Sequence, residues 1–512
     1  MARLGFLLDS TSCIGCHACT VACKSEHDVP LGVNRTWVKY IETGSFPDVA
    51  RKFTVMRCNQ CDDAPCMAIC PTSALFRADN GVVDFDDRRC IGCKSCMNAC
   101  PYDAIYINPE TSTAHKCNMC NHRLEVGLLP SCQIVCPTEA IKIGDLDDPT
   151  SEISRIIARD DVAVRAPEQN TKPKVFYRGA DQASLDPTRT AIANDGLIWA
   201  DRTAGHPSIP VQLGHKPTDE PGVVARTVYT TAHHMTWKAK VSGYLVTKAV
   251  AAGAMLVAAL LVLMGHSDQQ AAVGVVPPMV AGVFLGLTGV LLVSDLKQPG
   301  RFHFLLTRGN WSSWLVKGAY ILLAFAVICG LWWVGGLADQ GGLVEVLAIP
   351  AALGAAGTAG YTAYLFAQCE GRDLWQTPLL LPVLLAQAVT AGGAVYALLD
   401  LGMAIPEPTA IRWVLLGGLG ASAVLIAVEL ASHGSRHVEL AVEAMTRGRY
   451  ARQFWWGGVI VGLVVPALLV IIALAADIAG PALPAAAAVA ALAGMFAYED
   501  AFVRAGQSVP LS

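Results

Sequence analysis

The chain has 512 residues, of which 53% are hydrophobic and 16% are charged, and this composition excludes an ordinary soluble protein. Residues 237–512 carry 14 Lys or Arg and 14 Asp or Glu, so the whole net charge of -4 lies on the first 236 residues. A mildly acidic N-terminal part lacks the basic face that nucleic-acid binding requires.

The first 16 residues, MARLGFLLDSTSCIGC, contain neither a charged segment followed by a long apolar run nor a twin-arginine pair. Because export signals have those features, we expect this part of the chain to be assembled in the cytoplasm. In a reducing compartment, Cys residues at close and regular spacing are metal ligands rather than disulfide partners.

Sixteen of the 18 Cys residues form four similar blocks between positions 13 and 136. The first and third blocks read C-x2-C-x2-C-x3-C, the second reads C-x2-C-x4-C-x3-C, the fourth reads C-x2-C-x11-C-x3-C, and three of them end in Cys-Pro. In bacterial ferredoxins this spacing lets three thiolates hold one [4Fe-4S] cluster while the fourth Cys ligates the neighbouring cluster. Four ligands per cluster predict four [4Fe-4S] clusters. The predicted ligands are Cys13, Cys16, Cys19, Cys23, Cys58, Cys61, Cys66, Cys70, Cys90, Cys93, Cys96, Cys100, Cys117, Cys120, Cys132 and Cys136.

Structural zinc is the main alternative for pairs of Cys residues at C-x2-C spacing. Zinc sites join two such pairs across a longer spacer and do not need three evenly spaced Cys followed by x3-Cys-Pro. The same part of the sequence contains no nucleophile elbow, phosphate-binding loop or Rossmann fingerprint. The pattern therefore predicts a relay for electrons without a substrate-activating site.

Short strand-like pieces, LGFLLD, AIYIN and AIKIG, lie beside the Cys blocks, as expected for a ferredoxin unit that is used twice. From position 144 to about position 223 the sequence is polar and rich in turn residues. We expect an extended strap there, with one short helix at SEISRIIARD; a flexible tether is the alternative. The predicted domains are a four-cluster domain at 1–175, a strap at 176–236 and a membrane anchor at 237–512.

The membrane anchor contains eight apolar stretches, each near the ~20 residues that cross ~30 Å of hydrocarbon. Lys and Arg gather in the loops on one side of these stretches, and the other side carries only Arg412. The positive-inside rule then places both termini and the Cys blocks on the cytoplasmic side of a bacterial inner membrane. The predicted spans are 243–264, 273–294, 315–335, 343–366, 379–399, 413–431, 457–476 and 483–498.

The four blocks in this order resemble the electron-transfer subunit of the dimethyl sulfoxide reductase group of molybdenum oxidoreductases, over about residues 1–175. The second block with C-x4-C and the fourth block with its long third gap carry the resemblance. It implies that the first block pairs with the fourth and the second with the third. The implied clusters are held by Cys13, Cys16, Cys19 and Cys136; by Cys23, Cys117, Cys120 and Cys132; by Cys58, Cys61, Cys66 and Cys100; and by Cys70, Cys90, Cys93 and Cys96.

The membrane half resembles the polysulfide reductase (NrfD) membrane subunit family, whose members have eight spans, bind quinone and lack haem. The segments HHMTWKAKVSGYLVTKAVAAG, DLKQPGRFHFLLTRGNWSSWLVKGAYI and EDAFVRAGQSVPLS carry this resemblance. The two halves are usually separate chains in relatives and are fused here. The implied fold class is an α+β double-ferredoxin iron-sulfur head followed by an all-α polytopic membrane domain of eight transmembrane helices.

A quinone site needs an apolar slot and a few groups that hydrogen-bond the ring oxygens and move protons. Haem would need His residues inside the spans, and no His falls well inside any of them. Arg301 and Lys317 could instead be topology charges, and Trp311 an interfacial aromatic. Glu345 and Glu429, near span ends, are expected to be solvated. The candidates for quinone binding are Asp295, Arg301, His303, Trp311 and Lys317, followed by His234, Tyr244 and Lys248.

The sequence thus predicts a redox subunit with a quinone site and no catalytic site of its own. It would pass electrons between a separate molybdenum (bis-pterin) catalytic subunit and membrane quinone, with sulfite or another sulfur compound as that subunit's substrate. The alternative is a subunit of a hydrogenase-linked or alternative quinol-oxidising complex without molybdenum. A zinc-bearing membrane scaffold is a third, non-redox possibility.

Overall fold

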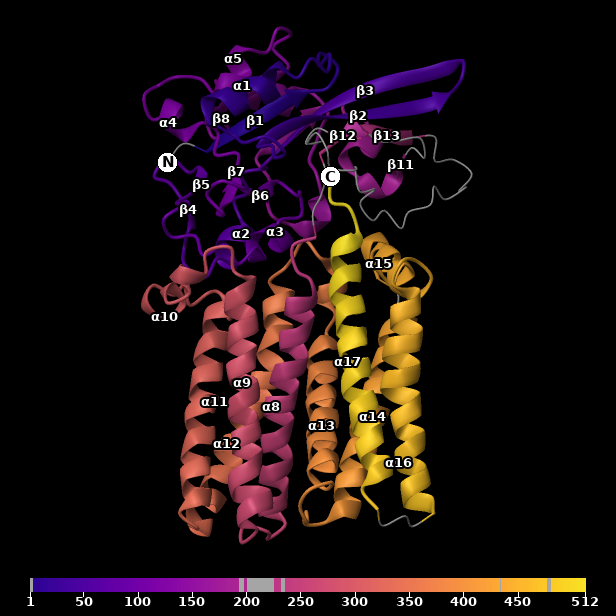
Figure 1. Cartoon of the computed structure of the whole chain (residues 1–512). Helices are drawn as coiled ribbons and strands as arrows, with labels where there is room; N and C mark the ends of the chain where they lie inside the picture. The colour runs from indigo at the N-terminus through magenta and orange to yellow at the C-terminus, as the bar shows by residue number, and fades with distance from the viewer. Residues whose placement is uncertain (1–2, 193–197, 200–224, 232–234, 433, 477–479) are drawn as a thin grey trace.

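The computed structural model describes residues 3–192, 198–199, 225–231, 235–432, 434–476 and 480–512. A head that contains the Cys blocks sits on one end of a bundle of long helices (Figure 1). The last long helix, α17 (Ala482–Ser508), returns to the head, so the C-terminus lies beside it.

A four-stranded sheet joins the first strand of the head to the polar segment after the fourth Cys block. Its order is β8-β1-β10-β9. Strand β1 (Leu4–Asp9) pairs antiparallel with β8 (Ile141–Asp145) and parallel with β10 (Val175–Arg178), which pairs with β9 (Val162–Ala163). LGFLLD and AIKIG are therefore strands, as predicted, and the head continues past the predicted boundary at 175.

Two short hairpins accompany the second and third Cys blocks. They are β4–β5 (Leu75–Arg77 and Val83–Phe85) and β6–β7 (Ile105–Ile107 and Ala114–Lys116). The unit of the first and fourth blocks has the β1–β8 pair of the larger sheet in place of hairpins. The ferredoxin unit is thus repeated, but its two copies are not alike.

The insertion between the first two blocks forms a long hairpin, β2 (Thr36–Ser45) and β3 (Asp48–Arg57), that projects from the head (Figure 1). Strand β13 (Ala225–Thr230) pairs with β2, and it also pairs with β11 (Ala191–Ile192) and β12 (Ile198–Trp199). The described parts of the predicted strap therefore contribute strands and short helices to the head, and the flexible-tether alternative does not hold for them.

The first five short helices of the head begin within or beside the Cys blocks. The polar segment contributes α6, at the position where the sequence predicted a helix, and Ser151 caps it. The helices are α1 (Ala18–Glu26), α2 (Pro65–Ala68), α3 (Ser95–Ala99), α4 (Asn121–Leu124), α5 (Ser131–Ile134), α6 (Glu152–Arg159), α7 (Gln182–Leu185) and the 3-10 turns η1 (Pro167–Gln169) and η2 (Pro187–Arg189).

Within the described residues, eight helices are long and apolar enough to cross a membrane, as the sequence predicted. The last one extends to Ser508, ten residues past the predicted end, so Arg504 lies inside it. The eight are α8 (Ala239–Leu263), η3 with α9 (Gln270–Val275 and Val276–Asp295), α11 (Trp314–Leu337), α12 (Gly341–Ala367), α13 (Leu380–Leu399), α14 (Pro408–Ala431), η6 with α16 (Gln453–Val464 and Val465–Ala475) and α17. Shorter elements on the head side are η4 (Pro299–Arg301), α10 (Phe304–Thr307), η5 (Asp373–Gln376) and α15 (Arg436–Thr446).

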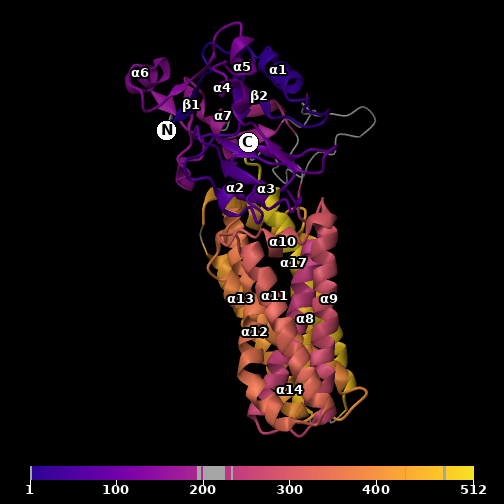
Figure 2. The same cartoon turned by 90° about the vertical axis from the view of Figure 1, so that its left-hand side faces the viewer.

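Helices α8 and α13 form the centre of the bundle, and 83% and 72% of their apolar windows are buried. Their backbones touch at Gly253 and Gly392, where an added Cβ on Gly253 would lie 2.4 Å from the Gly392 nitrogen. Helices α9 and α11 lie at the outside, with only 22% and 28% of those windows buried (Figure 2). This arrangement leaves space between α9 and α11 below the head.

Candidate functional site

The fold brings the Cys residues of the four blocks into four sets. Three small cavities are each lined by four of these Cys residues. In the remaining group, the Cys13 thiol interacts electrostatically with those of Cys16 and Cys136, and the Cys19 thiol interacts with that of Cys13. All 18 thiols are free of disulfides. The three cavity-lining sets are Cys70, Cys90, Cys93 and Cys96; Cys58, Cys61, Cys66 and Cys100; and Cys23, Cys117, Cys120 and Cys132. These are the sets that the family resemblance implies.

The donors in these sets suit iron-sulfur clusters. Backbone N–H groups donate to the sulfurs: Ala74 to Cys70 at 3.2 Å, and Gly92 and Ala114 to Cys90 at 3.4 Å. Such bonds to sulfur stabilise cluster thiolates and tune the cluster potential. In the described parts of the chain, no three His, Cys, Asp or Glu side chains are close enough to hold a single metal ion.

The loop of the third block also forms the contact with the membrane domain. Gly92 has φ +68°, a conformation that glycine adopts without strain, and an added Cβ would lie 2.5 Å from the Lys297 Cβ. The Gly92 and Ile91 carbonyls accept hydrogen bonds from the Lys297 and Gln298 N–H groups, both at 3.1 Å. The connection between α9 and α10 thus lies directly against this block.

Side-chain contacts also connect the loops around Cys70 and Cys93 to the membrane domain. Lys94, which follows Cys93, forms an ion pair with Asp295 at 2.7 Å, and the two side chains are only 7% and 19% exposed. Trp237 Nε1 donates to the Cys93 carbonyl at 3.2 Å, and Asn310 Nδ2 donates to the Cys70 carbonyl at 3.0 Å. The set of Cys70, Cys90, Cys93 and Cys96 therefore lies at the membrane end of the head.

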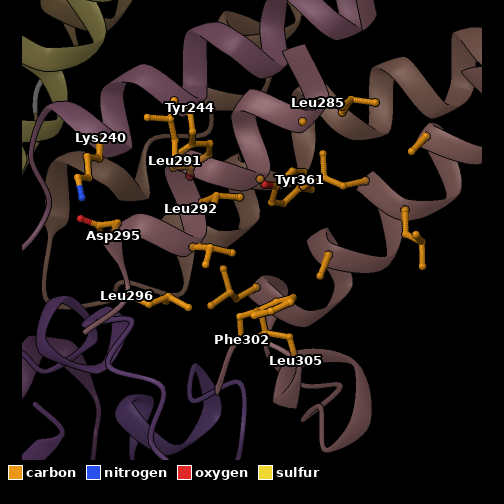
Figure 3. A pocket seen from close by; sticks show the side chains of 18 of the residues that line it. Lys240, Tyr244, Leu285, Leu291, Leu292, Asp295, Leu296, Phe302, Leu305 and Tyr361 are labelled. Atoms are coloured by element: carbon orange, nitrogen blue, oxygen red, sulfur yellow. The ribbon is translucent and has the colours of Figure 1, made fainter. Parts of the chain in front are cut away.

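A cavity of about 790 Å³ lies immediately below this set, lined by residues of α8, α9, α10, α11 and the head-side end of α12. Cys93 itself forms part of its wall. Figure 3 shows Lys240 and Asp295 pointing toward each other near the head, with Tyr244 next to Lys240 and Tyr361 farther along the pocket. We call this cavity the α9–α11 pocket.

The polar groups of the pocket are held in place by the surrounding helices. Lys240 Nζ donates to the Ser294 carbonyl at 2.7 Å. Behind the pocket wall, Lys248 Nζ lies 4.9 Å from the Tyr361 ring centre and 5.9 Å from that of Tyr244, and it donates to the Ala359 carbonyl at 2.9 Å. The buried Lys248 amino group thus lies close to the rings of two tyrosines that line the pocket.

Of the eight predicted quinone residues, Asp295 and Tyr244 line the pocket, and Lys248 lies behind it. His234 lies outside the described residues. The sequence reasoning did not select Tyr361, Lys240 or Trp237, which also line the pocket. Tyr361 is a polar residue inside a predicted span, and that signal could have found it.

The other four predicted residues, three in the segment between α9 and α11 and Lys317 in α11, do not line the pocket. Arg301 Nη1 donates to the Asp87 carbonyl at 2.6 Å and the Cys90 carbonyl at 2.9 Å. His303 is exposed beside Phe304, Trp311 is 60% exposed and stacks on Tyr320, and Lys317 lies over the Trp314 ring. These positions agree better with the alternatives given in the sequence analysis than with quinone binding. Those alternatives were topology charges for Arg301 and Lys317 and an interfacial aromatic for Trp311.

Comparison with known proteins gives two matches to family models. The model described as "4Fe-4S dicluster domain" matches residues 49–146, and the model described as "Polysulphide reductase, NrfD" matches residues 227–510, which is more than half of the chain. The protein belongs to the NrfD polysulphide reductase family. The chain joins an iron-sulfur domain and a multi-pass membrane domain, as the sequence predicted.

Curated relatives match about a third of this chain. It is 44% identical over 189 residues to the B subunit of tetrathionate reductase from Salmonella typhimurium, an alignment that covers 36% of this chain and 76% of the relative. It is 45% identical over 175 residues to the thiosulfate reductase electron transfer subunit PhsB of Salmonella typhi, covering 34% and 90%. It is 39% identical over 177 residues to the B chain of polysulfide reductase from Wolinella succinogenes, covering 34% and 93%.

Proposed function

We propose that this chain is the electron-transfer and membrane-anchor subunit of a respiratory oxidoreductase, and that it exchanges electrons with quinone in the α9–α11 pocket. The observation that carries the proposal is the position of Cys93, which belongs to a set of four thiols and also lines the pocket. An acceptor in the pocket therefore lies against the last group of the relay. The names of the relatives, which are subunits of tetrathionate, thiosulfate and polysulfide reductases, support the same function.

Four [4Fe-4S] clusters, when bound to the four sets of thiols, would carry single electrons between the two ends of the head. The protein contributes the thiols, the N–H groups that donate to their sulfurs, and a fixed geometry. Arg57 adds a charged donor, since its Nη1 lies 3.4 Å from Cys132 Sγ. The set near the membrane is held by the Lys94–Asp295 ion pair and the Trp237 hydrogen bond.

Reduction of a quinone to a quinol takes up two electrons and two protons. The pocket supplies an apolar slot and, at the head end, hydroxyl, carboxyl and ammonium groups that can hydrogen-bond the ring oxygens. Asp295 and Tyr361 both line the pocket and would exchange protons with those oxygens, and Lys248 lies near the Tyr361 ring. Ionisable residues inside a membrane bundle are costly, and proton exchange with a quinone would account for this group.

The far end of the head would bind the catalytic subunit. There Cys16 is exposed, and the surface around the set of Cys13 carries exposed apolar side chains, including Ile14 (58%), Val21 (64%) and Ile134 (57%). Helices α1 and α5, which carry Val21 and Ile134, lie at the end of the head away from the bundle (Figures 1 and 2). Exposed apolar groups beside a redox centre suit a protein partner that must exclude water from the contact.

We propose a molybdenum bis-pterin subunit as that partner. The complex isolated by a tag on this chain is expected to contain molybdenum or tungsten in a co-purifying larger subunit, as measured by metal analysis. Nickel, or haem c without either metal, would contradict this choice and support the hydrogenase-linked or quinol-oxidising alternative.

We also propose that the head faces the cytoplasm, because the loops on its side carry most of the Lys and Arg of the membrane domain. Phe46, at the tip of the β2–β3 hairpin, is 92% exposed. A single new thiol from Phe46→Cys is expected to react with a membrane-impermeant maleimide in inverted vesicles but not in right-side-out vesicles. Gly402→Cys, in the exposed turn at the other end of the bundle, is the matched control and should show the reverse. Labelling of position 46 from outside the cell would overturn the orientation.

A further inference from the structure

Arg57, the last residue of β3, is a fully buried cation inside the head. Its Nη1 donates to Cys132 Sγ at 3.4 Å, and its Nη2 donates to Thr36 Oγ1 at 3.3 Å. The guanidinium group also lies over the Phe6 ring, 4.2 Å from the ring centre. These contacts hold the charge against the sulfur atoms of one set of thiols. Arg57 lines the same cavity as this set, which we call the Cys132 set and which consists of Cys23, Cys117, Cys120 and Cys132.

Thiols rather than carboxylates surround the Arg57 charge. Its strongest charge interaction is with Cys132, and it also interacts with Cys19 of the neighbouring set. Within the described part of the chain, no Asp or Glu forms an ion pair with it, whereas Lys174, another buried cation of the head, pairs with Asp62 at 3.3 Å. A buried charge without an opposite charge is strongly destabilising. The negative charge of a thiolate-bound cluster would supply the opposite charge here.

A fixed positive charge changes how readily a nearby cluster accepts an electron. Reduction of a [4Fe-4S] cluster adds one electron, with no bond broken and no proton bound, so the cluster becomes one unit more negative. A nearby cation therefore stabilises the reduced form more than the oxidised form. Hydrogen bonds to the cluster sulfurs act on the potential as well. Arg57 supplies both, and an arginine keeps its charge at every physiological pH.

We propose that Arg57 raises the reduction potential of the cluster held by the Cys132 set and, to a smaller extent, that of the cluster that includes Cys19. The inference rests on the proposed four-cluster relay and adds a positioning residue to it, because Arg57 acts through the thiols that bind the cluster. Its charge reaches two neighbouring sets, so its loss would change the energy of electron transfer between them.

Arg57→Gln removes the charge and keeps a polar side chain. The test is an EPR-monitored redox titration of the purified native complex, in which the signal of the Cys132 set is identified by its loss in Cys132→Ser. We expect the reduction equilibrium of this cluster to shift about tenfold or more toward the oxidised form, which lowers its midpoint potential by about 59 mV or more for one electron. The cluster that includes Cys93 should keep its potential, and the iron content should stay unchanged.

Two further variants separate the charge of Arg57 from its role in packing. Arg57→Lys keeps the charge, and Thr36→Val removes the Oγ1 that accepts from Nη2 while leaving the guanidinium in place. Both should keep the midpoint potential of the Cys132 set close to that of the wild type. If Arg57→Gln fails to retain its iron, Arg57→Lys decides the question alone, because a tenfold shift in that variant would show that the charge is not the cause.

An unchanged midpoint potential in iron-loaded Arg57→Gln would overturn the proposal. So would equal shifts in Arg57→Gln and Arg57→Lys, or an equal shift of all the clusters in Arg57→Gln. Failure of the proposed relay gives a different result. If Cys132→Ser kept the full iron content and every EPR signal of the wild type, the assignment of a cluster to these thiols would be wrong.

Discussion

Cys93→Ser is expected to stop electron exchange between the head and quinone. Cys93 belongs to the set of thiols nearest the membrane, and it also lines the pocket. A serine hydroxyl is a poor ligand for an iron-sulfur cluster, which requires thiolates. We expect quinone-linked turnover to fall about 100-fold or more, because changes beside a metal site already cost 10–100-fold. Iron content should fall from about 16 to about 12 atoms per chain, counting four irons per cluster.

Two other thiols provide controls for this variant. Cys369 is a buried thiol outside the four sets, and its Sγ lies 3.6 Å from the Leu365 carbonyl. Cys369→Ser should keep the full iron content and activity. Cys16→Ser, at the far end of the head, should impair electron exchange with the catalytic subunit while leaving exchange between quinone and the remaining clusters intact. Normal quinone turnover in Cys93→Ser would show that electrons reach the membrane by another route.

Asp295→Asn is expected to lower quinone turnover about 100-fold without changing the iron content or the EPR spectra of the head. The carboxyl group lines the polar end of the pocket, and loss of a positioned acid or base typically costs 10²–10⁴-fold. The measurement is steady-state quinone reduction or quinol oxidation, with EPR of the same sample to check the clusters.

The ion pair with Lys94 requires a second variant, because Asp295 also helps to hold the head on the bundle. Lys94→Gln removes the ion pair and keeps the carboxyl group. If Asp295 acts in proton exchange, Lys94→Gln should retain most of the activity that Asp295→Asn loses. Equal losses in the two variants would mean that Asp295 only positions the head. Glu345→Gln, an exposed carboxyl at the opposite end of the bundle, should have no effect.

The Cys blocks and the eight helices could be predicted from the sequence because each depends on a local pattern, whereas the pairing of the blocks was implied only by the family resemblance. The spacing of Cys residues within a block defines its thiols, and a run of apolar residues defines a span. The pocket depends on how the spans pack. Tyr361 and Asp295 lie on different helices, and only the packing of α12, α8 and α9 brings them to one cavity.

Charged residues in loops predicted the lining of the α9–α11 pocket less well than polar residues within the spans did. Arg301 was selected for its position between two spans, but its guanidinium satisfies backbone carbonyls of the head. Glu429 was expected to be solvated near a span end and is instead only 9% exposed, with the Tyr498 hydroxyl 3.5 Å from its carboxyl group. The end of α17 was missed because its polar residues resemble a loop, although Gln507 forms hydrogen bonds with Thr236 and Trp237.

The most direct test of the central claim is a rapid-mixing experiment on the purified complex with its clusters reduced by dithionite. When a long-tail quinone is added, the clusters should be reoxidised, as followed by EPR and visible absorbance, with one quinol formed for every two electrons lost. The same clusters in Cys93→Ser should be reoxidised only slowly. Clusters that stay reduced in the wild-type complex after quinone is added would contradict the account.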